Sequence, residues 1–141
     1  MELNLKNKNA IVCGSSQGIG EAAAIELANL GANITLIARD ESKLLDVLTE
    51  LDKSQGQTHS FIAIDFRDSE KLREEVKVLK SNYHILVNNT GGPASGPITD
   101  ADTQSFEDAF RMHLVNNQIL VQKVVGGMKK EKYGRIVNII S

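Results

Sequence analysis

The sequence has 141 residues, of which 41% are hydrophobic and 24% charged, a composition that suits one globular domain rather than two. Sixteen basic and eighteen acidic residues give a net charge of −2, which argues against a protein that binds nucleic acid or an anionic membrane through a basic surface. The single cysteine, Cys13, excludes an internal disulfide, and no apolar run approaches the roughly 20 residues of a membrane span, so we expect a cytoplasmic protein.

In chain order, short apolar runs alternate with segments of helical periodicity. The apolar runs predict strands over residues 10–13, 34–38, 61–64, 84–87 and 135–140. The periodic segments predict helices over residues 19–30, 41–53, 68–80 and, as one long helix, about 103 to about 130. Because the strands are apolar throughout rather than alternating, we expect them to be buried on both faces, as in a parallel sheet. The alternation of strands and helices predicts a doubly wound, Rossmann-like α/β fold.

Local signals support the helix boundaries. Asp40 and Asp68 stand where N-caps are expected, and Gly31 stands where a left-handed C-cap is expected, whereas Gly126-Gly127 weakens the end of the long helix. Helical spacing predicts these inward-facing residues: Ile19, Ala23, Leu27 and Leu30 on the first helix, Leu44, Leu45, Leu48 and Leu51 on the second, and Leu72, Val76 and Leu79 on the third.

A glycine-rich loop, Gly14-Ser15-Ser16-Gln17-Gly18-Ile19-Gly20, joins the first predicted strand to the first predicted helix. Gly14 would allow the tight turn, Gly18 would let a pyrophosphate approach the backbone, and Gly20 would let the helix pack close to the sheet. The helix N-terminus would offer free N–H groups to the phosphates. The alternative is a plain strand-to-helix turn with glycines for packing, but three glycines at this spacing in a βαβ unit favour a dinucleotide site.

The spacing G-x-x-x-G-x-G, with two later motifs, resembles the short-chain dehydrogenase/reductase family. Asn88-Asn89-Thr90-Gly91 is similar to that family's N-N-A-G motif, with Thr90 in place of alanine, and residues 134–141 are similar to its fifth strand, which ends at a catalytic serine. Within the family, the chain looks most like 3-oxoacyl-acyl-carrier-protein reductase-like members. The resemblance covers residues 1–141 as a dinucleotide-binding domain that lacks the family's C-terminal elements.

The residues after the second strand bear on the choice of cofactor. Sites that prefer NAD usually hold the ribose 2′-hydroxyl with an acid there, whereas this chain has Ala38 followed by Arg39. A guanidinium pairs well with a 2′-phosphate, so the pair favours NADP over NAD. The alternative is that Arg39 only opens the second helix on the solvent side, which is a poor place for a cation.

Other cofactor contacts follow from the resemblance. Asp65, followed by Phe66, would lie at the adenine, and Asn89, Thr90 and Gly91 would line the adenosine ribose and the nicotinamide. Asn88 is expected to tie the sheet together through its amide, since a buried Asn requires several partners.

The family's chemistry is hydride transfer between nicotinamide and a carbonyl or alcohol, which for this chain could include 3-oxoacyl thioester reduction. Ser141 matches the family serine, but neither Tyr83 nor Tyr133 begins the family's Tyr-x-x-x-Lys motif. His113 stands at the place of the family's helix asparagine, where it is either a proton-relay residue or a packing residue, and Asn116 lies one turn later. We therefore expect an oxidoreductase in complete form and little activity from these 141 residues alone.

The remaining expectations concern metals, partners and alternatives. Three histidines and one cysteine without ligand spacing predict no metal site; we expect His84 to be structural and His59 to be exposed. A small-molecule substrate is expected, with a homo-oligomer or pairing with a C-terminal half. The alternatives are a dinucleotide-binding module without chemistry, and an interaction subunit that pairs through its apolar last strand.

Overall fold

The computed structural model of the chain describes residues 3–140. Five parallel strands form one sheet in the order β3-β2-β1-β4-β5. The strands are β1 (Asn9–Cys13), β2 (Asn33–Ala38), β3 (Ser60–Ala63), β4 (Ile85–Asn89) and β5 (Arg135–Ile139). The helices are α1 (Gly18–Asn29), α2 (Glu41–Glu50), α3 (Ser69–Lys77), α4 (Thr103–Phe110) and α5 (Asn116–Glu131), with a short 3₁₀ turn at Ile98–Asp100. The predicted α/β fold and its parallel sheet are confirmed.

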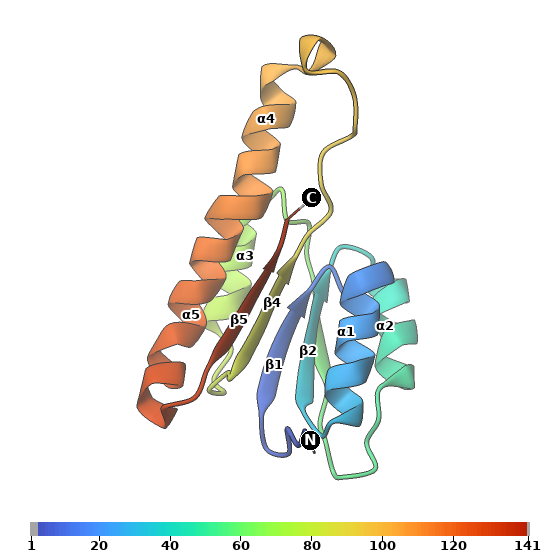
Figure 1. Cartoon of the computed structure of the whole chain (residues 1–141), viewed down its shortest axis with the longest axis vertical. Helices are drawn as coiled ribbons and strands as arrows, with labels where there is room; N and C mark the ends of the chain where they lie inside the picture. The colour runs from blue at the N-terminus through green and yellow to red at the C-terminus, as the bar shows by residue number, and fades with distance from the viewer. Residues whose placement is uncertain (1–2, 141) are drawn as a thin grey trace.

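Helices cover both faces of the sheet (Figure 1). On one face, α1 and α2 pack against Val12, Leu36 and Val87, which are neighbours in the parallel register. On the other face, α3 and α5 pack against Ile11 and Leu86. Because side chains alternate along each strand, these all-apolar strands supply both cores at once, as a doubly covered parallel sheet requires.

The predicted caps are confirmed, but the inward faces of the first two helices are only partly correct. The Asp40 carboxylate accepts from the Lys43 backbone N–H at 3.1 Å, and Asp68 accepts from Lys71 N–H at 3.0 Å. Leu45 is 45% exposed, because Leu44, Val47 and Leu51 form the buried stripe of α2.

The predicted inward face of helix α1 was also partly wrong. Ile19 is 63% exposed, whereas Gly20, Ala24 and Ala28 form the buried face. Small residues allow this helix to lie close to the strands, and a search for large apolar side chains overlooks them.

The long helix predicted from about residue 103 to about residue 130 is continuous in direction but not uniform. One π-helical segment, Arg111–Val115, separates α4 from α5, and π-helical bulges often occur at functional sites. Gly126-Gly127 does not interrupt α5, which continues to Glu131. Figure 1 shows α4 extending past the carboxyl ends of the strands.

The strand order places a topological switch point between β1 and β4. The chain leaves β1 toward β2 and β3, and then crosses back over the sheet to β4 and β5. Loops from the two directions separate there, and open α/β sheets bind ligands in the resulting crevice at the carboxyl ends. None of the helices in the described part of the chain has the length and apolar character needed to cross a membrane.

Candidate functional site

The glycine loop crosses the carboxyl end of β1 in a conformation that glycine suits. Gly14 and Gly18 have φ angles of +60° and +61°, in the left-handed region. A Cβ on Gly14 would collide with the carbonyl oxygen of Asn89, and one on Gly20 with the carbonyl oxygen of Gly14. A Cβ on Gly18 would meet nothing within 4 Å, so the backbone of Gly18 faces open space. The loop is therefore packed tightly against β4 on one side and is open on the other.

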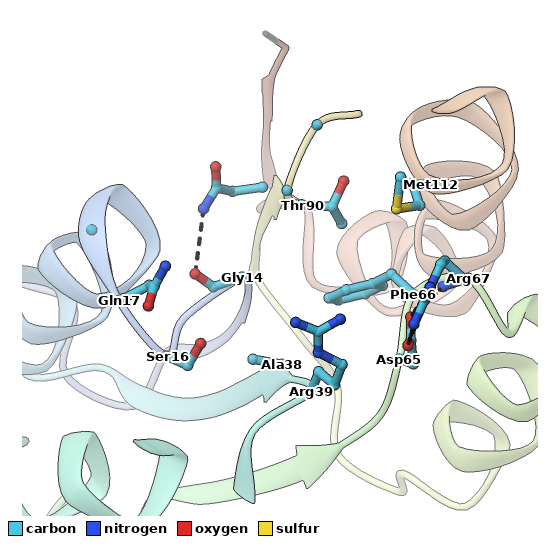
Figure 2. Close-up of a pocket in the computed structure, with 14 residues that line it drawn as sticks. Gly14, Ser16, Gln17, Ala38, Arg39, Asp65, Phe66, Arg67, Thr90 and Met112 are labelled. Carbon is cyan, nitrogen blue, oxygen red and sulfur yellow. Dashed lines mark hydrogen bonds and ion pairs between the residues drawn. The ribbon is translucent and has the colours of Figure 1, made fainter. Parts of the chain in front are cut away.

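That open side is part of a pocket of about 500 Å³ at the switch point. The pocket is lined by the glycine loop, the ends of β2 and β4, the loop after β3 and the π-helical segment (Figure 2). Its lining residues are Gly14, Ser16, Gln17, Gly18, Ala38, Arg39, Asp65, Phe66, Arg67, Asn89, Thr90, Gly91, Gly92 and Met112. Most of the residues predicted to bind a cofactor are thus brought together, although they come from four separate segments.

Three predicted cofactor residues lie outside this lining. Ser15 is buried, and its Oγ accepts from the backbone N–H of Ile37 at 3.1 Å, which fixes the loop to β2. Gly20 is buried under the loop, and the side chain of Ile19 is exposed. The structure therefore gives Ser15 and Gly20 supporting positions rather than lining positions.

Charge at the pocket is concentrated on its β2–β3 side. Arg67 donates to the Asp65 carboxylate from Nε and Nη2, and this interaction lowers the pKa of Asp65. Arg39 takes part in none of the ion pairs of the described residues, and Figure 2 shows its guanidinium directed into the pocket. The sequence analysis did not identify Arg67, although its position two residues after Asp65 in the same loop was a possible signal.

The predicted catalytic residues are only partly gathered at the pocket. Ser141 lies outside the described residues. His113, in the π-helical segment, has Nδ1 3.4 Å from the Oγ1 of the pocket residue Thr90, and its buried Nε2 has no hydrogen-bond partner among the described residues.

Asn116 lies deeper than His113. It is completely buried; its Oδ1 accepts from Ser69 Oγ at 2.7 Å, and its Nδ2 donates to the carbonyl oxygen of Phe66. Asn116 therefore ties the loop after β3, which carries three pocket residues, to the long helix.

The polar residues at the opposite end of the sheet are paired with one another. His84 is buried, accepts from the backbone N–H of Asn9 through Nδ1 and contacts Glu131 through Nε2, so the predicted structural role of His84 is confirmed. His59 was expected to be exposed, and this was wrong. It is half-buried, with Nδ1 accepting from Ile34 N–H at 3.1 Å and Nε2 2.8 Å from the Asp52 carbonyl oxygen.

Two further buried polar or thiol groups complete the description. The Nδ2 of Asn88 donates to Asn138 Oδ1 at 2.8 Å, which confirms that this amide ties β4 to β5. Cys13 is a core residue, and its burial raises the pKa of its thiol to about 12. In the part of the chain that the structure describes, no cluster of His, Cys, Asp or Glu side chains could hold a metal ion.

A glycine loop, a polar pocket at the switch point and a doubly covered parallel sheet define a Rossmann-type dinucleotide-binding fold. The family model for short chain dehydrogenases matches residues 8–141, and the chain belongs to that family. It is 30% identical, over 99% of its length, to an uncharacterized oxidoreductase of Staphylococcus saprophyticus. It is 32% identical, over 92% of its length, to the very-long-chain 3-oxoacyl-CoA reductase of Mycosarcoma maydis.

Among solved structures, the L-sorbose reductase of Gluconobacter frateurii, in complex with NADPH and L-sorbose, matches 96% of this chain with a TM-score of 0.85 and 29% identity. The chain covers 61% of the Staphylococcus relative, 39% of the Mycosarcoma relative and 53% of the L-sorbose reductase. It therefore spans about half the length of the proteins it matches.

Proposed function

We propose that this chain forms the NADP-binding part of an oxidoreductase that transfers hydride between nicotinamide and a carbonyl or alcohol. The observation that carries the proposal is the pocket at the switch point, with Arg39 directed into it at the end of β2. Ala38, only 4% exposed, occupies the position where an NAD-binding protein usually has an acid. The NADPH complex of L-sorbose reductase supports the same cofactor here.

The pocket lining offers a group for each part of a dinucleotide. Gly18 offers an open backbone beside the N-terminus of α1, which suits a pyrophosphate. Arg39 would take the 2′-phosphate, and Asp65 and Phe66 would border the adenine. Asn89, Thr90 and Gly91 also line the pocket and would border the adenosine ribose and the nicotinamide.

The bound nicotinamide would supply the hydride, and the protein would position the substrate and handle the proton. For the proton relay, the contacts favour His113 over Asn116. The Nε2 of His113 is without a partner among the described residues, whereas both polar atoms of the Asn116 side chain are hydrogen-bonded. We assign the relay position to His113, and Ser141 would hydrogen-bond the substrate oxygen.

For the substrate, we propose a 3-oxoacyl thioester. The support is the similarity to the very-long-chain 3-oxoacyl-CoA reductase. We also propose that the working protein is a homo-oligomer or is paired with a C-terminal half, because Phe106 and Phe110 on α4 and Val137 on β5 are about half exposed.

Titration with NADPH and NADH, followed by the fluorescence of the reduced nicotinamide or by calorimetry, tests the cofactor assignment. We expect tighter binding of NADPH, and we expect Arg39→Ala to weaken NADPH selectively because a charge-assisted contact is lost. Equal affinity for the two cofactors in the unmodified chain would contradict the proposal.

A further inference from the structure

A bidentate ion pair engages the one acidic side chain of the pocket lining. Asp65 is the only carboxylate among the lining residues in the described part of the chain. Its Oδ1 accepts from the backbone N–H of Arg67 at 2.9 Å and from Nε at 3.1 Å, and its Oδ2 accepts from Nη2 at 2.6 Å. Figure 2 shows the two side chains against each other at the edge of the pocket. Arg67 therefore engages both oxygens of the Asp65 carboxylate.

A bound dinucleotide would need the same carboxylate. Asp65 would repel the phosphates, and an ionised carboxylate can only accept, so its partner on the ligand must be an N–H or O–H donor. Hydrogen bonds from Arg67 are the largest cause of the lowered pKa of Asp65, and the charge of Arg39 contributes after them. If Arg39 takes the 2′-phosphate, the adenine of the same nucleoside brings its amino group toward Asp65. Arg67 and that amino group then compete for one carboxylate.

The long helix offers Arg67 a second carboxylate. Asp108 on α4 lies about one turn before Met112, which lines the pocket together with Arg67. The charge of Asp108 contributes, after the contacts with Asp65, to the raised pKa of Arg67, although the ion pairs among the described residues do not join the two. Asp108 is half-buried, and its Oδ1 accepts from Gln104 at 3.0 Å. Its Oδ2 takes part in none of the hydrogen bonds of the described residues, so one oxygen could receive a guanidinium.

The backbone beside Arg67 is anchored, whereas its side chain is not. The carbonyl oxygen of the preceding residue, Phe66, accepts from Nδ2 of the buried Asn116, which fixes this loop to the long helix. The Arg67 side chain is 58% exposed, and an exposed ion pair is held only weakly. Rotation about the side-chain bonds of Arg67 can therefore move its guanidinium from Asp65 toward Asp108 while the loop stays in place.

We propose that Arg67 is a latch, which competes with the dinucleotide for Asp65 and is received by Asp108 on α4 when the dinucleotide takes its place. The proposal rests on the proposed function, since its ligand is the dinucleotide of that site. A ligand that must displace the latch binds with an apparent affinity reduced in proportion to the fraction of molecules in which Asp65 is free. Because NADPH and NADH share the adenine, the latch lowers both affinities by the same factor.

Removing the charge of Asp108 tests the latch, because the expected change is opposite in sign to a simple charge effect. Dinucleotides are anionic, so the loss of a nearby acid should strengthen their binding through space. The latch predicts instead that Asp108→Asn weakens NADPH and NADH equally, by about twofold to fivefold, since Arg67 loses its second partner. Asparagine keeps the acceptor for Gln104. Glu107→Gln is the matched control, because Glu107 is the exposed neighbour on α4 and lies outside the pocket lining; it should weaken neither cofactor.

The second part of the test removes the latch itself. Arg67→Met keeps an apolar stem and should bind both cofactors at least as tightly as the unmodified chain, although a cation has been lost. Asp108→Asn should have no effect in the Arg67→Met background, so the double variant should bind about twofold to fivefold more tightly than Asp108→Asn alone.

Three results would overturn the latch while leaving the NADP site in place. They are unchanged affinities in Asp108→Asn, weaker binding of both cofactors by Arg67→Met, and an effect of Asp108→Asn that persists without Arg67. An unmodified chain that binds neither dinucleotide would instead overturn the proposed function and this inference with it.

Discussion

The two ends of the sheet use their polar residues in opposite ways. At the amino end, His84 accepts from the Asn9 backbone N–H and bonds to Glu131, and the Tyr83 hydroxyl lies 3.1 Å from Thr35 Oγ1. At the carboxyl end, Arg39 lines the pocket and takes part in none of the ion pairs of the described residues, and the Gly18 backbone faces open space. A polar group paired within the protein contributes to folding, whereas one left facing a pocket is available to a ligand. The contrast supports our proposal that the carboxyl end binds the ligand.

The largest expected effect is a difference between cofactor binding and catalytic turnover at the carboxyl end. The pocket contains the groups that we propose bind the cofactor, but these 141 residues contain no Tyr-x-x-x-Lys pair to deliver a proton to the developing alkoxide. A positioned general acid is worth about 10² to 10⁴ in rate. We therefore expect the chain to bind NADPH but to reduce carbonyls slower, by about that factor, than a family member that has the Tyr-x-x-x-Lys pair. NADPH oxidation with β-ketoacyl thioesters and small ketones measures this. Turnover at ordinary enzyme rates that disappears in His113→Ala would show that His113 supplies the proton.

A matched pair of glycines tests where the ligand binds. Gly18 and Gly56 both have positive φ angles, +61° and +86°, and a Cβ on either meets nothing within 4 Å. Valine should therefore strain both positions, but only at Gly18 would its side chain stand where the pyrophosphate approaches. We expect Gly18→Val to weaken NADPH binding by about 100-fold or more and Gly56→Val to retain it, as measured by titration of the folded variants. Comparable losses in the two variants would place the site elsewhere.

Much of this contrast was predictable from local sequence. The glycine loop, the caps at Asp40 and Asp68 and the apolar strands each depend on neighbouring residues, and the fold followed from them. The pocket residues after β3 and β4 were instead predicted from the family resemblance. The buried stripes of α1 and α2 were partly misassigned, because one face is made of small residues and because adjacent Leu44 and Leu45 point about 100° apart on a helix.

Contacts between residues that are distant in sequence could not be predicted from local patterns. His59 is held by groups from two other segments, and the Lys43–Gln17 and Asn116–Ser69 contacts also join segments that are distant in sequence. The π-helical segment likewise has no simple periodic signature. What a side chain does in this protein depends mostly on such contacts, and only the structure shows them.

A buried residue that holds the pocket loop at the carboxyl end gives an intermediate effect. Asn116→Ala would leave the Phe66 carbonyl and the Ser69 hydroxyl without their partners, so we expect a loss of about 1–3 kcal/mol in the free energy of unfolding. Since Phe66 lines the pocket, NADPH affinity should fall as well. Denaturant unfolding measures the loss, and Asn117→Ala on the same helix is the control. An Asn116→Ala variant as stable as Asn117→Ala would contradict this tether.

The smallest expected effect is on the pH dependence of stability, through Glu131 at the amino end. The hydrogen bond from His84 is the main cause that lowers the pKa of Glu131 from its usual 4.5, so this carboxylate stabilises the fold above that pH. The stabilisation is lost as the pH falls through the lowered pKa of the folded state. Glu131→Gln should therefore reduce the melting temperature slightly at pH 7 and less in acid. A difference that grows as the pH falls would contradict this sign, and NADPH affinity at pH 7 should not change.

Hydrogen–deuterium exchange with and without NADPH tests most directly the claim that the carboxyl end alone is the binding end. We predict that NADPH slows exchange in the glycine loop, residues 14–20, and in the segment after β4, residues 89–92. Exchange around His59 and in residues 131–135 at the amino end should remain unchanged. Protection confined to the amino end, or no protection of the glycine loop at saturating NADPH, would contradict the account.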